Sequence, residues 1–240
     1  MKKIGVVILT AALIAVMVFC GHGIWDEMSE YKEADDINKD IATDARADKF
    51  DGNIDFEALW KINPDVVGWL YSEDTSINYP VVKCDSNSKY LRTDLRGYYS
   101  ISGTLFIDAG NSDNLQDFNT IIYGHHMKDP KQTMFGSFKN YIGNQKYYEK
   151  HKQLEYITPE GKYHLQVIAV CTTPAGGKAY DKNYDTEEER EMFIFDAVSS
   201  SEVQPAFTAT GDDKLMTLST CAYEYEGARY VVIGKLVPWE

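Results

Sequence analysis

Short runs of β-branched and aromatic residues recur between Val66 and Ile233, and they limit the choice of fold more than any other feature of the chain. Such residues favour strands, and the Gly, Pro, Asn, Asp and Ser residues between the runs favour turns. We expect strands over residues 66–70, 77–82, 103–108, 119–126, 154–158, 163–173, 217–221 and 229–233. Many short strands and few helices predict a mainly β domain, a closed β-barrel with short peripheral helices.

Two segments of this domain have helical patterns instead. Asp55 is a suitable N-cap for apolar residues at helical spacing up to Ile62, and Pro64 ends that helix. Thr186 and the glutamates that follow it form a capping box, which begins an amphipathic helix that ends near Val198.

The N-terminus has the pattern of a signal anchor. An almost uncharged run from Ile4 to Trp25 is long enough to span a bilayer as a helix. Lysines precede it and acidic residues follow it, which places the N-terminus in the cytoplasm. We therefore expect residues 1–25 to be a transmembrane helix and the protein to cross the cell membrane once. A cleaved signal peptide or a lipoprotein site at Cys20 fits less well, because Phe19 is bulky where a small residue is needed.

Residues 26–54 are polar and rich in charge, which predicts a solvated and partly helical stalk. Residues 55–240 then form one extracellular domain. The formal net charge of the 240-residue chain is −13, so no basic face is available for the phosphates of a nucleic acid. The chain has four cysteines without close spacing, which indicates neither a zinc ribbon nor a disulfide framework. The sequence does not decide whether Cys84 and Cys171 form a disulfide.

Cys221 is the candidate reactive cysteine. If the runs 217–221 and 229–233 pair as neighbours, Cys221 ends one strand where Arg229 begins the next. A nearby cation favours the reactive thiolate, and the same guanidinium can bind an oxyanion. Ser219 lies on the same strand face as Cys221. The alternative is an inert, half-buried cysteine whose neighbouring arginine pairs with Glu224 or Glu226.

A second polar cluster, Tyr123-Gly124-His125-His126-Met127, ends the strand that begins at residue 119. Strand alternation directs Tyr123 and His125 to one face and His126 to the other. Two adjacent histidines also occur in metal sites, but the sequence offers no third ligand nearby.

These two motifs resemble the sortases, the cysteine transpeptidases that attach surface proteins to the Gram-positive cell wall. Their signature is TLxTC with a downstream arginine and an upstream histidine, here Cys221, Arg229 and His125. The string INPDVVGWL followed by INYPVV, and the helix inserted before TLSTC, resemble class B members in particular. The resemblance covers about residues 55–238 and implies a sortase-type β-barrel.

The resemblance also implies a mechanism and partners. Cys221 would cleave an NPQTN-like sorting motif at its Thr, forming a thioester, and pass the acyl group to an amine of a peptidoglycan precursor or cross-bridge. His125 would act as acid and base, and Arg229 would steady the oxyanion. The donors would be surface proteins with a C-terminal sorting signal. No cofactor and no metal is implied.

Further positions match the substrate groove of class B members. These are Asn87, Leu91, Tyr123, Tyr180, Ser219 and Thr220. One departure is Ala222, which stands where class B members often carry an acid that Glu224 could replace. Two alternatives remain at this point: a class B-like pilin polymerase that uses a Lys amine, and a non-catalytic, membrane-tethered binding module.

Overall fold

The computed structural model describes residues 2–112, 114–221 and 226–239, without the side chains of residues 2–9, 11, 12 and 221. The helices are α1 (Lys2–Asp44), α2 (Phe56–Ile62), α3 (Gln145–His151) and α4 (Glu187–Ser199), with 3-10 turns η1 (Lys89–Leu91), η2 (Gly136–Tyr141) and η3 (Lys178–Tyr180). The strands are β1 (Val66–Tyr71), β2 (Asn78–Val82), β3 (Leu105–Ile107), β4 (Asn119–Tyr123), β5 (Gln153–Ile157), β6 (Lys162–Pro174), β7 (Leu215–Cys221) and β8 (Ala228–Pro238).

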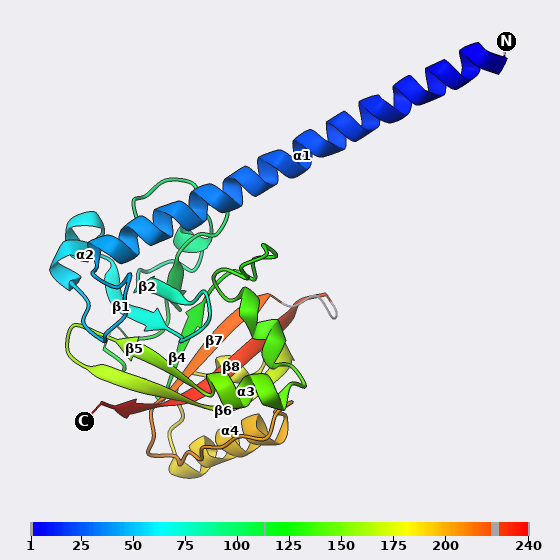
Figure 1. Ribbon diagram of the computed structural model, residues 1–240. Helices are drawn as coiled ribbons and strands as arrows, with labels where there is room; N and C mark the ends of the chain where they lie inside the picture. The colour runs from blue at the N-terminus through cyan, green and yellow to red at the C-terminus, as the bar shows by residue number, and fades with distance from the viewer. Residues whose placement is uncertain (1, 113, 222–225, 240) are drawn as a thin grey trace.

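The strands close into a barrel in the order β1-β2-β3-β4-β7-β8-β6-β5 (Figure 1). Antiparallel pairing of β1 with β5 completes the ring. The pairs β2–β3 and β4–β7 are parallel, because the chain crosses over between the strands of each pair. The predicted closed β-barrel with short peripheral helices is confirmed.

Along each strand, side chains alternate between the two faces of the sheet. One set fills the barrel interior, and the other packs against the helices on the outer face. On β8, Val232 belongs to the cluster that fills the interior, whereas Val231 and Ile233 pack in the cluster that holds Phe193 of α4. A third cluster joins α2 and the end of α1 to the outer sides of β1, β2 and β3. These three clusters fill the barrel and hold the helices against its outer face.

Both predicted helix starts are confirmed. The Asp55 side chain accepts a hydrogen bond of 2.9 Å from the Ala58 amide at the start of α2. At the start of α4, Thr186 and Glu189 form the reciprocal capping box.

Helix α1 is longer than the sequence predicts. It runs from Lys2 to Asp44 and extends far from the barrel at its N-terminal end (Figure 1). Residues 1–25 were expected to be its membrane-spanning part. Within the described part of the chain, no helix has both the length and the apolar character needed to cross a membrane.

The end of α1 packs against the domain, so a fully solvated stalk is wrong for residues 41–47. Ile41 and Ala45 are completely buried, and Asp35 forms a 2.6 Å ion pair with Lys131. The apolar residues of this segment are few and lie among many charges, which is why composition alone indicates a spacer.

Cys84 and Cys171 are both free cysteines, so the bridge left open by the sequence does not form. Cys171 is on β6 and Cys84 follows β2, and these strands are not neighbours in the barrel.

Candidate active site

Cys221 and Arg229 lie opposite each other at one end of two paired strands. β7 pairs antiparallel with β8, and the last pair in the register is Cys221 with Arg229, as predicted. On its other side β7 pairs in parallel with β4, so its backbone is held from both sides. The side chain of Cys221, and the whole of Ala222 and Glu224, lie outside the described residues.

His125 follows the end of β4, where Gly124 allows a close approach between backbone and core. The Gly124 amide donates a 3.1 Å hydrogen bond to the Ser219 carbonyl, which extends the pairing with β7. A Cβ atom at Gly124 would lie 2.5 Å from a methyl carbon of Leu105 and 2.7 Å from the Phe135 ring. Any larger residue would displace the segment that carries His125.

The two adjacent histidines diverge, although β4 ends at Tyr123 and not at residue 126 as the sequence predicts. His125 Nε2 lies 2.6 Å from the Leu91 carbonyl oxygen. His126 instead has its ring 5.6 Å from that of Tyr230, and its backbone pairs with Met134. Because a carbonyl oxygen only accepts, Nε2 of His125 carries the proton in this hydrogen bond. Nδ1 is then the nitrogen of His125 that can exchange a proton with a substrate.

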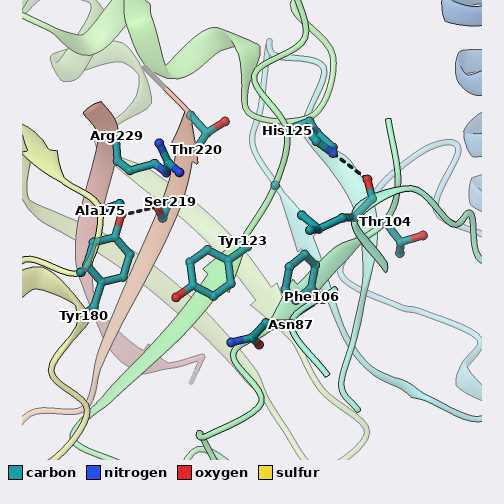
Figure 2. A pocket seen from close by; sticks show the side chains of 13 residues that line it. Asn87, Thr104, Phe106, Tyr123, His125, Ala175, Tyr180, Ser219, Thr220 and Arg229 are labelled. Carbon is teal, nitrogen blue, oxygen red and sulfur yellow. Dashed lines mark hydrogen bonds between the residues drawn. The ribbon is translucent and has the colours of Figure 1, made fainter. Parts of the chain in front are cut away.

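A pocket of about 350 Å³ brings the predicted residues together (Figure 2). It is lined by Asn87, Leu91, Thr104, Phe106, Tyr123, Gly124, His125, Ala175, Gly176, Tyr180, Ser219, Thr220 and Arg229. All eight described candidate side chains are in this set. Figure 2 shows Arg229 and Tyr180 on one side of the pocket and His125 on the other, with Tyr123 between them.

The Arg229 side of the pocket is formed by strand residues and the turn η3. The hydroxyls of Tyr180 and Ser219 lie 2.7 Å apart, within hydrogen-bond distance. Arg229 Nη1 donates to the Ala228 carbonyl at 2.9 Å. The Thr220 hydroxyl is buried and has no hydrogen-bond partner among the described residues. A buried hydroxyl without a partner is costly, and it is available to a substrate bound in the pocket.

Asn119 in β4 fixes the turn that carries Tyr180. Its Nδ2 donates to the carbonyls of Ala179 and Asp181, at 3.1 and 2.9 Å. Thr217 on β7 donates in turn to Asn119 Oδ1 at 2.9 Å. Two fully buried strand residues thus hold Tyr180 against the sheet, although neither lines the pocket.

Asp108 is a residue that the sequence analysis missed. It follows β3, is 6% exposed, and its Oδ2 accepts 3.0 Å hydrogen bonds from both Asn87 Nδ2 and the Tyr123 hydroxyl. Its Oδ1 accepts from the Gly110 amide at 2.8 Å and lies 3.2 Å from Lys182 Nζ. One carboxylate therefore orients two pocket side chains. The sequence feature that could have identified Asp108 is a lone carboxylate directly after an apolar strand.

Burial and hydrogen bonding shift the pKa values of this site. Burial lowers the pKa of His125, and the nearby Arg92 charge lowers it further, against the opposing hydrogen bond to Leu91. Burial pushes the pKa of Asp108 up, but hydrogen bonds from Gly110, Lys182 and Tyr123 outweigh it and hold that pKa below its usual value. At neutral pH, Asp108 is therefore a carboxylate and His125 is mostly a neutral imidazole.

A metal site at the two histidines has no support in the described part of the chain, where no three His, Cys, Asp or Glu residues come together as ligands. The site consists of a strand-borne cysteine and arginine, a facing histidine, and a pocket lined by aromatic and hydroxyl side chains. Such an arrangement is suited to thiol-dependent acyl transfer.

Known proteins match the chain over this same region. A model of the sortase domain family matches residues 70–237. Sortase B of Staphylococcus aureus is 36% identical over 184 residues, which are 76% of this chain and 74% of that protein. Sortase B of Listeria monocytogenes is 30% identical over 237 residues, or 95% of each chain. A solved Staphylococcus aureus sortase B–substrate complex is 35% identical and has a TM-score of 0.72, covering 77% of this chain and 85% of that one.

The family model matches most of the barrel, and the histidine, the cysteine and the arginine all lie within the matched residues. The chain therefore belongs to the sortase family and is a cysteine transpeptidase of the sortase B type.

Proposed function

We propose that this transpeptidase cleaves an NPQTN-like sorting motif in surface proteins and joins them to a peptidoglycan amine. The observation that carries the proposal is the position of Cys221 and Arg229 at paired strand ends, with His125 lining the same pocket as Arg229. A solved complex of the Staphylococcus aureus relative with a substrate supports the assignment of a donor substrate.

In the first step, the Cys221 thiolate attacks the carbonyl carbon of the motif's Thr, and a tetrahedral intermediate forms. Arg229 stabilises the negative oxygen, and the unpartnered Thr220 hydroxyl is a second donor on the same side. His125 as imidazolium donates its Nδ1 proton to the leaving amine. The C–N bond breaks, and the donor's acyl group remains on Cys221 as a thioester.

In the second step, the acceptor amine attacks the thioester carbon and restores the Cys221 thiolate. Neutral His125 takes the proton that the amine loses, so each turnover ends in the starting protonation state. Because burial lowers the pKa of His125, only a minority of free enzyme carries the imidazolium at neutral pH. Cysteine and histidine therefore need not form a tight ion pair.

We also propose that residues 1–25 hold the enzyme in the cell membrane, with the N-terminus in the cytoplasm and the barrel outside. The support is the uncharged run from Ile4 to Trp25 and the exposure of its described apolar residues, such as Phe19 at 81%. Deleting residues 1–25 should move the protein from the membrane fraction to the soluble fraction and leave peptide cleavage unchanged. A truncated protein that stays in the membrane fraction would contradict the anchor.

The test of the catalytic proposal is cleavage of a fluorogenic NPQTN peptide by full-length protein, with and without an added amine. We expect cleavage between Thr and Asn, a covalent adduct on Cys221 by mass spectrometry, and no turnover by Cys221→Ala. Appreciable turnover by that variant would remove Cys221 from the mechanism. If the wild-type protein neither cleaves the peptide nor reacts rapidly with a thiol-directed vinyl sulfone, the protein is a binding module instead.

A further inference from the structure

An exposed aromatic pair lies on the hairpin that follows Leu91, the residue to which His125 bonds, and the steps above do not use it. Tyr98 and Tyr99 are each 70% exposed. Outside α1, the only other described large apolar side chains more than half exposed are Met192 and Phe195 of α4. Tyrosine has an apolar ring and a polar hydroxyl, which makes it common at binding surfaces.

The backbone beneath the two tyrosines is firmly held. They follow a tight turn, in which the Tyr98 amide donates to buried Asp94 and the Gly97 amide donates to the Asp94 carbonyl. Tyr99 pairs across the hairpin with Thr93. Leu95, at the turn, is 2% exposed and anchors it in the core. The tyrosines are thus exposed on a fixed hairpin and not on a loose loop.

This hairpin is continuous with the His125 side of the pocket. Leu91 precedes the hairpin, lines the pocket, is 41% exposed, and accepts the hydrogen bond from His125 through its carbonyl. Thr104, also in the pocket lining, donates to the Thr93 carbonyl at 2.9 Å. The hairpin therefore joins the pocket on the side of His125, which lies across the pocket from Arg229 (Figure 2).

The proposed role of His125 in proton transfer determines which substrate contacts this surface. The inference therefore rests on the proposed function. The histidine exchanges protons with the departing and incoming amines, so both amines must lie beside it. The bulk of the acceptor must then extend from His125 over the neighbouring surface. We propose that Tyr98 and Tyr99, together with Arg92, form the docking surface for the peptidoglycan acceptor.

The chemistry of the surface fits that occupant. Sugar rings have apolar C–H faces that pack flat on aromatic rings, and their hydroxyls can bond to the tyrosine hydroxyls. The exposed Arg92, whose guanidinium already donates to the Ile101 carbonyl at 2.8 Å, is next to the tyrosines and can pair with the carboxylates of a peptidoglycan stem peptide. Arg96, on the same hairpin, already lies 3.5 Å from Asp40 of α1, so Arg92 is the cation offered to the acceptor. Positive charge and exposed aromatics thus coincide on the hairpin that follows Leu91.

The experiment measures acceptor kinetics with full-length protein, using a soluble disaccharide–stem peptide with a free amine and, separately, hydroxylamine. For the double variant Tyr98→Ala/Tyr99→Ala, we expect the KM for the disaccharide–stem peptide to rise about tenfold, as loss of aromatic interface residues typically produces. The KM for hydroxylamine, which is too small to reach the hairpin, should stay the same. The matched control is Met192→Ala/Phe195→Ala, which removes the exposed pair on α4 and should alter neither value.

A binding measurement separates failure of this inference from failure of the proposed function. Inactive Cys221→Ala protein should bind the disaccharide–stem peptide, and the added tyrosine changes should weaken that binding whatever donor the enzyme uses. Unchanged KM and unchanged binding in the tyrosine variant would overturn the inference. The inference would also be overturned if the tyrosine changes weakened binding of a lysine-containing peptide without sugars and left binding of the disaccharide–stem peptide unchanged. The surface would then serve a protein acceptor.

Discussion

The two sides of the pocket are constructed differently. On one side, Ser219, Thr220 and Arg229 belong to β7 and β8, and each of these strands is paired along both edges. On the other side, His125 lies beyond the end of β4, and its ring bonds to the carbonyl of Leu91, 34 positions earlier in the chain.

The proposed roles divide between these two sides. The proposed nucleophile and oxyanion donor stand on paired strands, where small displacements would reduce the rate strongly. The proposed proton-transfer group stands beyond a strand end, where it would serve a leaving amine and then an incoming one. The predictions below test this division, in order of decreasing effect.

Replacing the histidines one at a time gives the largest expected difference. His125→Ala removes the proton-transfer group and should reduce peptide turnover by up to roughly 10⁴-fold. His126→Ala removes a ring that packs on Tyr230 and should retain most of the activity. Turnover and rates of vinyl sulfone alkylation should be measured for both variants. If His126→Ala were the inactive one, the assignment of the catalytic histidine would be off by one position.

Arg229→Lys tests the strand side. Lysine keeps the charge but not the planar fork, so turnover should fall by about 10²–10³-fold if the guanidinium binds the oxyanion. The pH profile of Cys221 alkylation should change little, since a point charge is enough to favour the thiolate. Near-normal turnover would reduce Arg229 to a source of positive charge.

Asp108→Asn tests the carboxylate behind the pocket, which orients the lining residues Asn87 and Tyr123. The amide keeps the size of the side chain, but it cannot accept hydrogen bonds from Asn87, Tyr123, Gly110 and Lys182 together. The KM for the donor peptide should rise about tenfold, as expected for one or two weakened charge-assisted hydrogen bonds. The alkylation rate of Cys221 should not change.

The matched control for Asp108 is Asp117→Asn. Asp117 also accepts several hydrogen bonds, including those from Asn111 and Asn183, but neither of these partners lines the pocket. This variant should lose stability without a change in the donor KM. Equal rises in KM for the two variants would mean that the Asp108 effect is one of general stability.

Arg92→Gln should give the smallest effect. The Arg92 charge lowers the pKa of His125, after the larger effect of burial. Its removal should raise that pKa, so the imidazolium persists to higher pH and the alkaline limb of donor hydrolysis moves upward. NMR titration of the His125 ring in Cys221→Ala protein measures the shift directly. A pKa that falls would contradict the stated cause.

The sequence predicts the strand-borne side of the site better than the side that depends on contacts between distant residues. Strand periodicity was enough to pair Cys221 with Arg229, because this pairing depends on backbone regularity. It did not predict that β4 ends at Tyr123, before the two histidines. The role of Asp108 depends on contacts with Asn87 and Lys182, which are distant in the chain, and no local pattern encodes them. The docking of residues 41–47 was missed for a similar reason, since a few buried alanines are hidden within a charged segment.

The parallel pairing of β4 with β7 has a consequence for the order in which the protein folds. Asn119 is in register with Leu215, so this pair closes a loop of about two fifths of the 240-residue chain. Such long-range pairing forms late, because the entropy of closing the loop must be overcome first. The segments that carry His125 and Cys221 therefore come together only after the last strands of the chain have paired. A chain whose barrel has not yet closed holds an unassembled site.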